Sequence, residues 1–139
     1  MKKKNFNIFF LILSIFSIDR LTKYLITNKL DDGINISITP FLSFNLIKNE
    51  GIAFGLFSFN ETIYYNLLTI FILIIVIVIL WMVIKSKGLE KIGFSLVFGG
   101  AVGNLFDRIF YSSVPDFIDI HFGNFHWFIF NVADIFITL

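Results

Sequence analysis

The feature that most constrains this chain is an uncharged run over residues 62–84, whose centre reads FILIIVIVILWMVI. A helix needs about 20 apolar residues to cross a bilayer, so this run predicts a transmembrane helix. The chain has 139 residues, of which 57% are hydrophobic and 15% are charged. A soluble domain of this size cannot bury so much apolar surface. A soluble enzyme is therefore excluded, and we expect a single integral membrane domain over residues 1–139.

Three further spans are predicted, over residues of about 6–26, 92–110 and 127–139. At 1.5 Å per residue, the last span reaches about 20 Å where about 30 Å is needed, so we expect a truncated fourth helix. Lysines precede the first span and recur in the connection KSKGLEK between the second and third spans. Because short basic segments stay in the cytoplasm, we expect a four-transmembrane-helix bundle with a cytoplasmic N-terminus.

The segment between the first two spans, about 31–59, is expected to face outward. Its stretch INISITPFLSFNLI shows patches of period-two alternation with β-branched residues, a pattern typical of short strands. We therefore predict a small antiparallel β-sheet on the outer membrane surface. The fold class is membrane, mainly α.

Charged residues within the spans point to a site. A carboxylate at mid-bilayer costs about 2.5–3.5 kcal/mol on insertion scales. The helix rise nevertheless places Asp19, Asp107 and Asp134 at one depth, in the outer third of the membrane. Asn104 precedes Asp107, and Asn131 precedes Asp134, by three residues, so each pair shares a helical face. Two such pairs at matched depth favour a functional site over hydrogen bonds that only join helices.

Asp116, in SVPDFIDIHF, is placed to approach the level of Asp134 from the outer side. Asp119 is three residues further on and would share a helical face with Asp116. A solvated loop acid is an equal alternative for Asp116 and the favoured one for Asp119. The two histidines, His121 and His126, lie nearby without an HExxH-type pattern, so we expect no metal.

Small residues accompany these polar clusters. The chain has three alanines, Ala53, Ala101 and Ala133, each beside a polar group, and GGAVG over residues 99–103 leaves one helix nearly bare. Small residues allow helices to approach closely. The net charge of +1 excludes nucleic acid as a partner, and the absence of cysteine excludes thiolate chemistry.

Five blocks now occur in order: DRLTK at 19–23, NEGIAFG at 49–55, GGAVGNLFDR at 99–108, VPDFID at 114–119 and FNVAD at 130–134. Together they resemble the motif blocks of the lipoprotein signal peptidase family, also called signal peptidase II. The resemblance implies an intramembrane aspartic endopeptidase that removes the signal peptide from diacylglyceryl-modified prolipoproteins. It also implies a multi-pass protein of the bacterial inner membrane, with its active site near the outer leaflet and no cofactor.

The resemblance also implies roles for individual residues. Its catalytic pair maps onto Asp116 and Asp134. The residues that match substrate-binding positions are Asn49, Gly51, Asn104, Arg108 and Asn131. Those that match positions supporting the site are Asp19, Lys23, Ala53, Phe54, Asp107 and Ala133. Depth alone would also admit Asp107 to the catalytic pair, whereas the resemblance makes it structural. The implied partners are a lipid-modified prolipoprotein and membrane lipid, and we expect a monomer.

The chemistry of two carboxylates fits this role. Two close carboxyl groups share one proton, so one can accept a proton from water while the other donates to the scissile carbonyl. Two alternatives stay open from the residues. One is a small proton-coupled transporter in which Asp19, Asp107 and Asp134 form a relay. The other is an inactive, truncated remnant of the peptidase.

Overall fold

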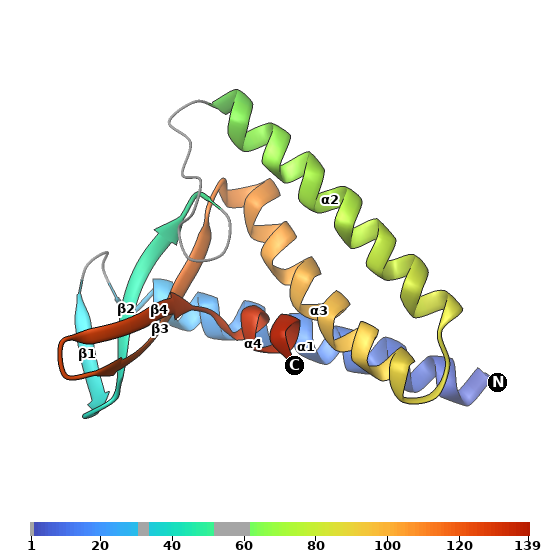
Figure 1. Cartoon of the computed structure of the whole chain (residues 1–139), viewed down its shortest axis with the longest axis horizontal. Helices are drawn as coiled ribbons and strands as arrows, with labels where there is room; N and C mark the ends of the chain where they lie inside the picture. Colours follow the sequence, from blue (N-terminus) through green and yellow to red (C-terminus); the bar gives the residue numbers. More distant parts are fainter. Residues whose placement is uncertain (1, 31–33, 52–61) are drawn as a thin grey trace.

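A computed structural model describes residues 2–30, 34–51 and 62–139. Its elements in chain order are α1 (Lys2–Thr27), β1 (Asn35–Thr39), β2 (Leu42–Asn49), α2 (Thr62–Lys85), α3 (Gly88–Tyr111), β3 (Val114–Phe122), β4 (Phe125–Phe130) and α4 (Val132–Thr138). The sheet lies at one end of the molecule, and the N-terminus of α1 lies at the other (Figure 1). The predicted combination of helices with a small antiparallel sheet is confirmed.

The strands form one antiparallel sheet in the order β1-β2-β3-β4. The sheet is larger than predicted, because β3 and β4 join it as a hairpin. Residues 123–124 make the turn of this hairpin, and Gly123 has a φ of +57°, a conformation that tight hairpin turns require. Of the predicted outer segment, residues 31–33 and 52–59 lie outside the described residues.

The fourth helix begins at Val132, so the predicted start near Trp127 is wrong. Residues 127–130 belong to β4, where they pair with β3. The stretch FHWFIF is apolar and aromatic, and short runs of this kind fit a strand as well as a helix. The polar residue Asn131 separates the strand from the helix and acts as the N-cap of α4.

The helices pack through glycines on α3. The Cα of Gly99 faces Ile15 of α1, while a side chain at Gly100 would collide with the carbonyl oxygen of Ala133 at the start of α4. A side chain at Gly103 would lie 2.5 Å from a carboxylate oxygen of Asp19. This is the close approach that the bare stretch 99–103 predicted, and it brings α1, α3 and α4 together at one level.

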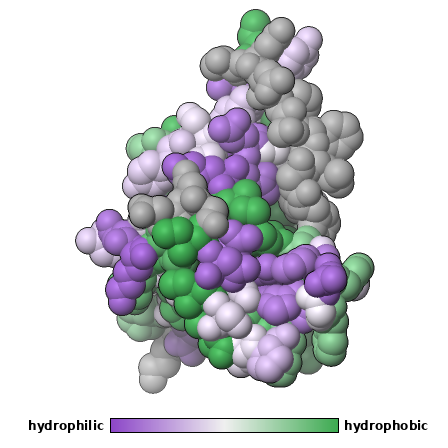
Figure 2. Space-filling view, turned by 90° about the vertical axis from the view of Figure 1, so that its left-hand side faces the viewer, coloured by the Kyte–Doolittle hydropathy of each residue, from purple (hydrophilic) through white to green (hydrophobic). Residues whose placement is uncertain are grey.

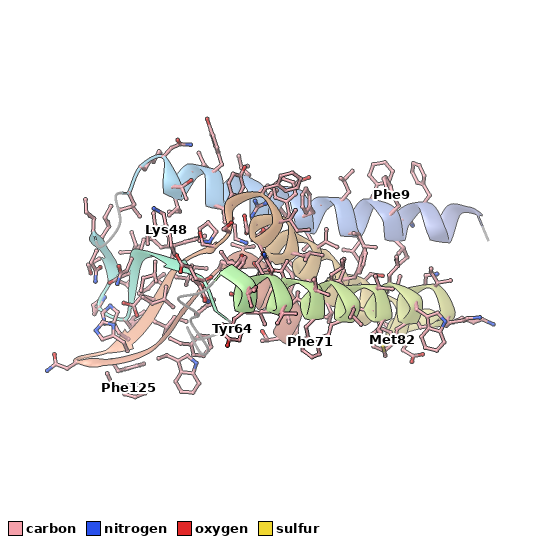
Figure 3. The ribbon with its side chains drawn as sticks, turned by 90° about the horizontal axis from the view of Figure 1, so that it is seen from above. Phe9, Lys48, Tyr64, Phe71, Met82 and Phe125 are labelled. Carbon is pink, nitrogen blue, oxygen red and sulfur yellow. The ribbon has the colours of Figure 1, made fainter. Side chains whose placement is uncertain are left out.

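The outer surfaces of the helices are strongly apolar. Phe9 on α1 and Phe71 on α2 point away from the bundle (Figure 3) and are 60% and 59% exposed. Seen from the sheet end, by contrast, hydrophilic side chains cover much of the surface (Figure 2). In the described part of the chain, one helix, Ile63–Lys85, is long and apolar enough to cross a membrane. Membrane crossing by the other three helices remains a prediction.

Candidate active site

Two carboxylates from different elements meet around the side chain of Asn131. Asp116 lies on β3, and Asp134 lies in the first turn of α4. The amide nitrogen of Asn131 donates to Asp116 Oδ1 at 2.6 Å, and its backbone N–H donates to Asp134 Oδ2 at 3.0 Å. Its amide oxygen accepts the backbone N–H of Asp134 at 3.2 Å. Asn131 is fully buried and donates to both carboxylates, so it bridges them directly.

Strand β2 supplies a second amide to the site. Asn49 lies at the end of β2, beside β3, and its Nδ2 donates to Asp116 Oδ2 at 2.8 Å. Its Oδ1 accepts the backbone N–H of Gly51 at 2.9 Å, which fixes the orientation of the amide group. Both oxygens of Asp116 therefore accept a hydrogen bond from an asparagine amide.

Helix α3 supplies the corresponding amide to the other carboxylate. Asn104 Nδ2 donates to Asp134 Oδ1 at 2.8 Å. Its own oxygen accepts from Lys23 Nζ at 2.7 Å. The lysine can only donate, so it must bond to the oxygen of the Asn104 amide. The NH₂ group of Asn104 therefore faces Asp134.

Behind Asn104 lies a buried cluster of four charged side chains. Lys23 Nζ is 2.7 Å from Asp107 Oδ2 and 3.0 Å from Asp19 Oδ2. Arg20 donates to Asp107 Oδ2 at 2.7 Å and to Asp19 Oδ2 at 3.2 Å. Two cations thus balance two carboxylates that are almost inaccessible to solvent. Pairing of this kind is what makes buried charge tolerable.

Asp19 also connects α1 to the start of α4. Its Oδ1 accepts the backbone N–H of Ala133 at 3.1 Å, one residue before Asp134. The first N–H groups of a helix lack partners within the helix, so this carboxylate satisfies one of them. The contact explains why residue 103 is glycine, since a side chain there would meet the carboxylate of Asp19.

Arg108 on α3 is buried and bonds only to carbonyl oxygens among the described residues. Its guanidinium donates to the carbonyl of Asn104 at 3.2 Å and to that of Gly51 at 2.9 Å. Its Nε has no hydrogen-bond partner within the part of the chain that the structure describes. The carbonyl oxygen of Arg108 itself accepts the hydroxyl of Tyr65 at 3.2 Å, which links α2 to the site.

These polar groups line one side of a cavity of about 210 Å³. The polar lining residues are Asn49, Asn104, Arg108, Asp116, Asn131 and Asp134. The apolar wall of the cavity comes largely from α2, with residues from α3, β3 and α4, and consists of Ile72, Ile75, Val76, Ile79, Val97, Ala101, Val114 and Ile137. The cavity therefore combines an apolar lining with a cluster of polar groups.

The environment of Asp116 changes its acidity. Burial, followed by the negative charge of Asp134, raises the pKa of Asp116 to about 6. The hydrogen bonds from Asn49 and Asn131 act in the opposite direction and limit the rise in this pKa. A carboxyl group with this pKa can hold a proton close to neutral pH, as a general acid requires.

The predicted site residues largely come together. The structure gathers Asp19, Lys23 and Asp107 in the charged cluster, and the asparagines and Arg108 around Asp116 and Asp134. Ala53 and Phe54 lie outside the described residues. Asp119 does not share a helical face with Asp116, because residues 114–122 form a strand. Instead, its carboxylate accepts a hydrogen bond from His126.

Three features of the site were missed at the sequence level. Arg20 completes the charged cluster, Tyr65 bonds to Arg108, and isoleucines of α2 form the apolar wall. Arg20 was detectable, because two buried carboxylates need two cations and Lys23 supplies one. No sequence pattern distinguishes the cavity-facing residues of α2, since that helix is apolar on every face. Within the described residues, no group of three or more histidine and carboxylate side chains could bind a metal ion.

Comparison with known proteins gives consistent results. The family model described as signal peptidase (SPase) II matches residues 11–139. The lipoprotein signal peptidase of Pelagibacter ubique is 50% identical over the whole chain, which covers 87% of that protein. The lipoprotein signal peptidase of Wigglesworthia glossinidia brevipalpis is 45% identical over 90% of this chain and 82% of its own length.

Solved structures show the same similarity. A bacterial membrane enzyme determined by the in meso method at 2.3 Å resolution superposes with a TM-score of 0.81. It is 31% identical, and the match covers 95% of this chain and 80% of that enzyme. A second structure of a bacterial membrane enzyme, at 1.9 Å resolution, superposes with a TM-score of 0.77 at 31% identity.

Proposed function

The chain belongs to the signal peptidase II family, and we propose that Asp116 and Asp134 are the catalytic pair of its peptidase site. The protein is an aspartic endopeptidase of the bacterial membrane that removes signal peptides from prolipoproteins. The observation that carries the residue assignment is the bridge through Asn131, which donates a hydrogen bond to both carboxylates. The cavity beside this bridge is lined by both aspartates.

Asp116 is the member of the pair that holds the shared proton. Its raised pKa, about 6, favours the neutral carboxyl group. Each carboxylate accepts two N–H donors, but only Asp134 also lies in the first turn of α4, where the helix dipole favours negative charge. Asp134 is therefore the carboxylate that takes a proton from the attacking water. The two groups titrate as one unit, so the pair has one shared proton.

The reaction then follows from these positions. Water attacks the scissile carbonyl carbon while its proton passes to Asp134, and the proton of Asp116 passes to the carbonyl oxygen. The tetrahedral product collapses when Asp134 returns its proton to the departing amide nitrogen and Asp116 regains its proton from the hydroxyl. The enzyme leaves the cycle in its initial protonation state, and no metal is needed for any step.

Other polar groups bind the substrate backbone. Arg108 has a buried Nε without a partner among the described residues, and it lines the cavity. It is positioned to donate to a carbonyl oxygen of the bound peptide. Asn131 and Asn104 use their amide groups on the aspartates, so we assign them chiefly a positioning role, although the resemblance placed them at substrate-binding positions.

The resemblance implies a substrate that carries a diacylglyceryl group on a cysteine, and this lipid anchors the substrate at the membrane. Four helices cross the membrane with the N-terminus in the cytoplasm, and the sheet and the site lie at the outer leaflet. The protein acts as a monomer, because the cavity and both carboxylates come from one chain. A relay through Asp19 and Asp107 is disfavoured, since ion pairs with Lys23 and Arg20 already neutralise them.

The assignment is tested by Asp116→Asn and Asp134→Asn in lipid vesicles with a diacylglyceryl-modified prolipoprotein. Each variant should insert normally and lose at least about 10³-fold in cleavage rate, because each removes one proton-transfer group. Glu90→Gln is the matched control, since it makes the same change at an exposed position in the first turn of α3. Cleavage at the parental rate by either aspartate variant would reject the pair.

A further inference from the structure

The hairpin of β3 and β4 connects the two aspartates of the proposed pair. Asp116 lies on β3, and β4 runs through Phe130 directly into Asn131 and α4 (Figure 1). The alignment of the two strands therefore sets where Asp134 stands relative to Asp116. A shift of one residue in a strand reverses the face of every side chain on it, so this alignment must be fixed.

The alignment is not regular along the hairpin. His121 is opposite His126, and Asp119 is opposite Ile129. Between these two pairs the register advances by two residues on β3 and by three on β4. One extra residue of β4 is thus accommodated as a bulge, at Trp127 and Phe128. The turn at residues 123–124 fixes the strand pairing between the turn and the bulge. The strand pairing between the bulge and Asn131 is separated from the turn by the bulge, so it needs a further contact to fix its register.

One side-chain interaction spans the bulge. His126 Nδ1 donates to both carboxylate oxygens of Asp119, at 3.0 and 2.9 Å. His126 belongs to the pairing on the turn side, and Asp119 belongs to the pairing on the side of the catalytic residues. Asp119 is fully buried, and within the described residues His126 is the only group that donates to it. A slip of the bulge would therefore leave a buried carboxylate without its donor, which is costly.

We propose that Asp119 and His126 are positioning residues for the peptidase reaction, because their contact fixes the place of the β4 bulge and with it the separation of Asp116 from Asp134. This inference rests on the proposed catalytic pair. A displacement of about 1 Å at reacting groups can cost about 100-fold in rate. The contact should therefore act on the chemical step and leave substrate binding at the apolar wall almost unchanged.

The first test compares two histidine variants in the full chain, in lipid vesicles with a diacylglyceryl-modified prolipoprotein. His126→Phe keeps a ring at a half-exposed position but removes the donor to Asp119. It should lower kcat by about 10- to 100-fold and change KM by less than about twofold. His121→Phe is the matched control. It removes the hydrogen bond to Ser43 at 2.9 Å, which does not span a bulge, and should leave kcat within about twofold.

The second test replaces the contact by a covalent link in the same register. The chain contains no cysteine, and Asp119 and Ile129 are opposite each other in the antiparallel ladder, where Cα spacing suits a disulfide. Asp119→Cys with Ile129→Cys should be about as slow as His126→Phe when reduced. On oxidation it should recover to within about threefold of the parent. A disulfide from Phe122→Cys and Phe125→Cys, on the turn side, should not rescue His126→Phe.

Each outcome has a consequence for the proposal. Parental kcat in folded His126→Phe overturns it, and so does an oxidised Asp119→Cys/Ile129→Cys variant that stays as slow as the reduced form. Failure of these two thiols to pair overturns the register on which it depends. If His126→Phe does not fold, the Asp119→Cys/Ile129→Cys variant still tests the proposal, because its disulfide replaces the Asp119–His126 contact with a covalent link. Activity in Asp116→Asn or Asp134→Asn would instead reject the catalytic pair itself.

Discussion

At the scale of single residues, the site depends on asparagines that orient two carboxylates and tune their acidity. Asn49 and Asn131 each donate to one oxygen of Asp116, at 2.8 and 2.6 Å. An amide donor stabilises the charged form of a carboxyl group, so both hydrogen bonds lower the pKa of Asp116. Burial and the charge of Asp134 exceed this effect and keep the pKa at about 6. The position of that pKa is therefore adjustable by mutation.

Asn49→Ala should move the alkaline limb of kcat/KM to higher pH. In the proposed mechanism Asp116 must be protonated to donate to the scissile carbonyl, so kcat/KM should fall as pH rises through the pKa of Asp116 in the free enzyme. Without the amide of Asn49, that pKa rises, and the proton is retained to higher pH. The measurement is a pH profile of kcat/KM in vesicles. Asn45→Ala on the same strand is the control, and a limb that moves to lower pH in Asn49→Ala would contradict the assignment.

The same pKa has a consequence for stability with a defined sign. Asp116 has a pKa of about 6 in the folded protein and an ordinary value of 3.8. The folded state therefore binds this proton more tightly than the unfolded state does. The resulting stabilisation is complete below about pH 4 and is lost as pH rises through about 6. Above this range the buried carboxylate is charged, and its contacts with Asn49 and Asn131 limit the cost.

At the scale of elements, α4 reaches the site because α3 presents glycines to it. A side chain at Gly100 would meet the backbone carbonyl of Ala133, which cannot move without shifting the start of α4. Gly100→Ala should therefore displace Asp134, with a cost of about 1–3 kcal/mol in stability and a loss of at least about tenfold in cleavage rate. Thermal unfolding in detergent and the cleavage assay measure the two effects.

Gly93→Ala on the same helix is the matched control for this change. A side chain at Gly93 would meet no atom within 4 Å. Alanine is a better helix former than glycine, so this variant should be as stable as the parent or up to about 1 kcal/mol more stable. Equal behaviour of Gly93→Ala and Gly100→Ala would show that the close approach of α3 to α4 is not required.

Some elements could be predicted from the sequence and others could not. The uncharged run of α2 has one plausible structure, because its length and composition suit a membrane helix. The stretch FHWFIF could form a helix or a strand on its local pattern alone. It forms a strand because it pairs with β3, and no local pattern reveals this partner. The helix rise, which placed Asp19 and Asp107 at the same depth in the membrane, correctly predicted that they lie together. It did not reveal Arg20 as their second cation, because that contact depends on how α1 packs against α3.

At the scale of the whole molecule, a group of lysines lies at the end opposite the sheet. Lysines occur at the start of α1 and in the connection from α2 to α3, while the sheet lies at the opposite end of α1 (Figure 1). Basic segments of short length are retained in the cytoplasm. The sheet end, where many hydrophilic side chains reach the surface, would then lie outside (Figure 2). In this orientation the proposed catalytic pair, which lies where the sheet meets the helices, would lie at the level of the outer leaflet.

This orientation predicts opposite labelling of two engineered cysteines. The chain has no cysteine of its own, so single thiols report their positions without background. Ser37 on β1 and Lys87 between α2 and α3 are both exposed, and both substitutions are at surface positions. In intact cells with a permeable outer envelope, Ser37→Cys should react with a membrane-impermeant maleimide, and Lys87→Cys should react only after the inner membrane is disrupted. Because exposure in the fold is similar at the two positions, a difference in labelling reports membrane side alone. The reverse pattern would place the sheet and the proposed catalytic pair in the cytoplasm and would contradict the orientation proposed here.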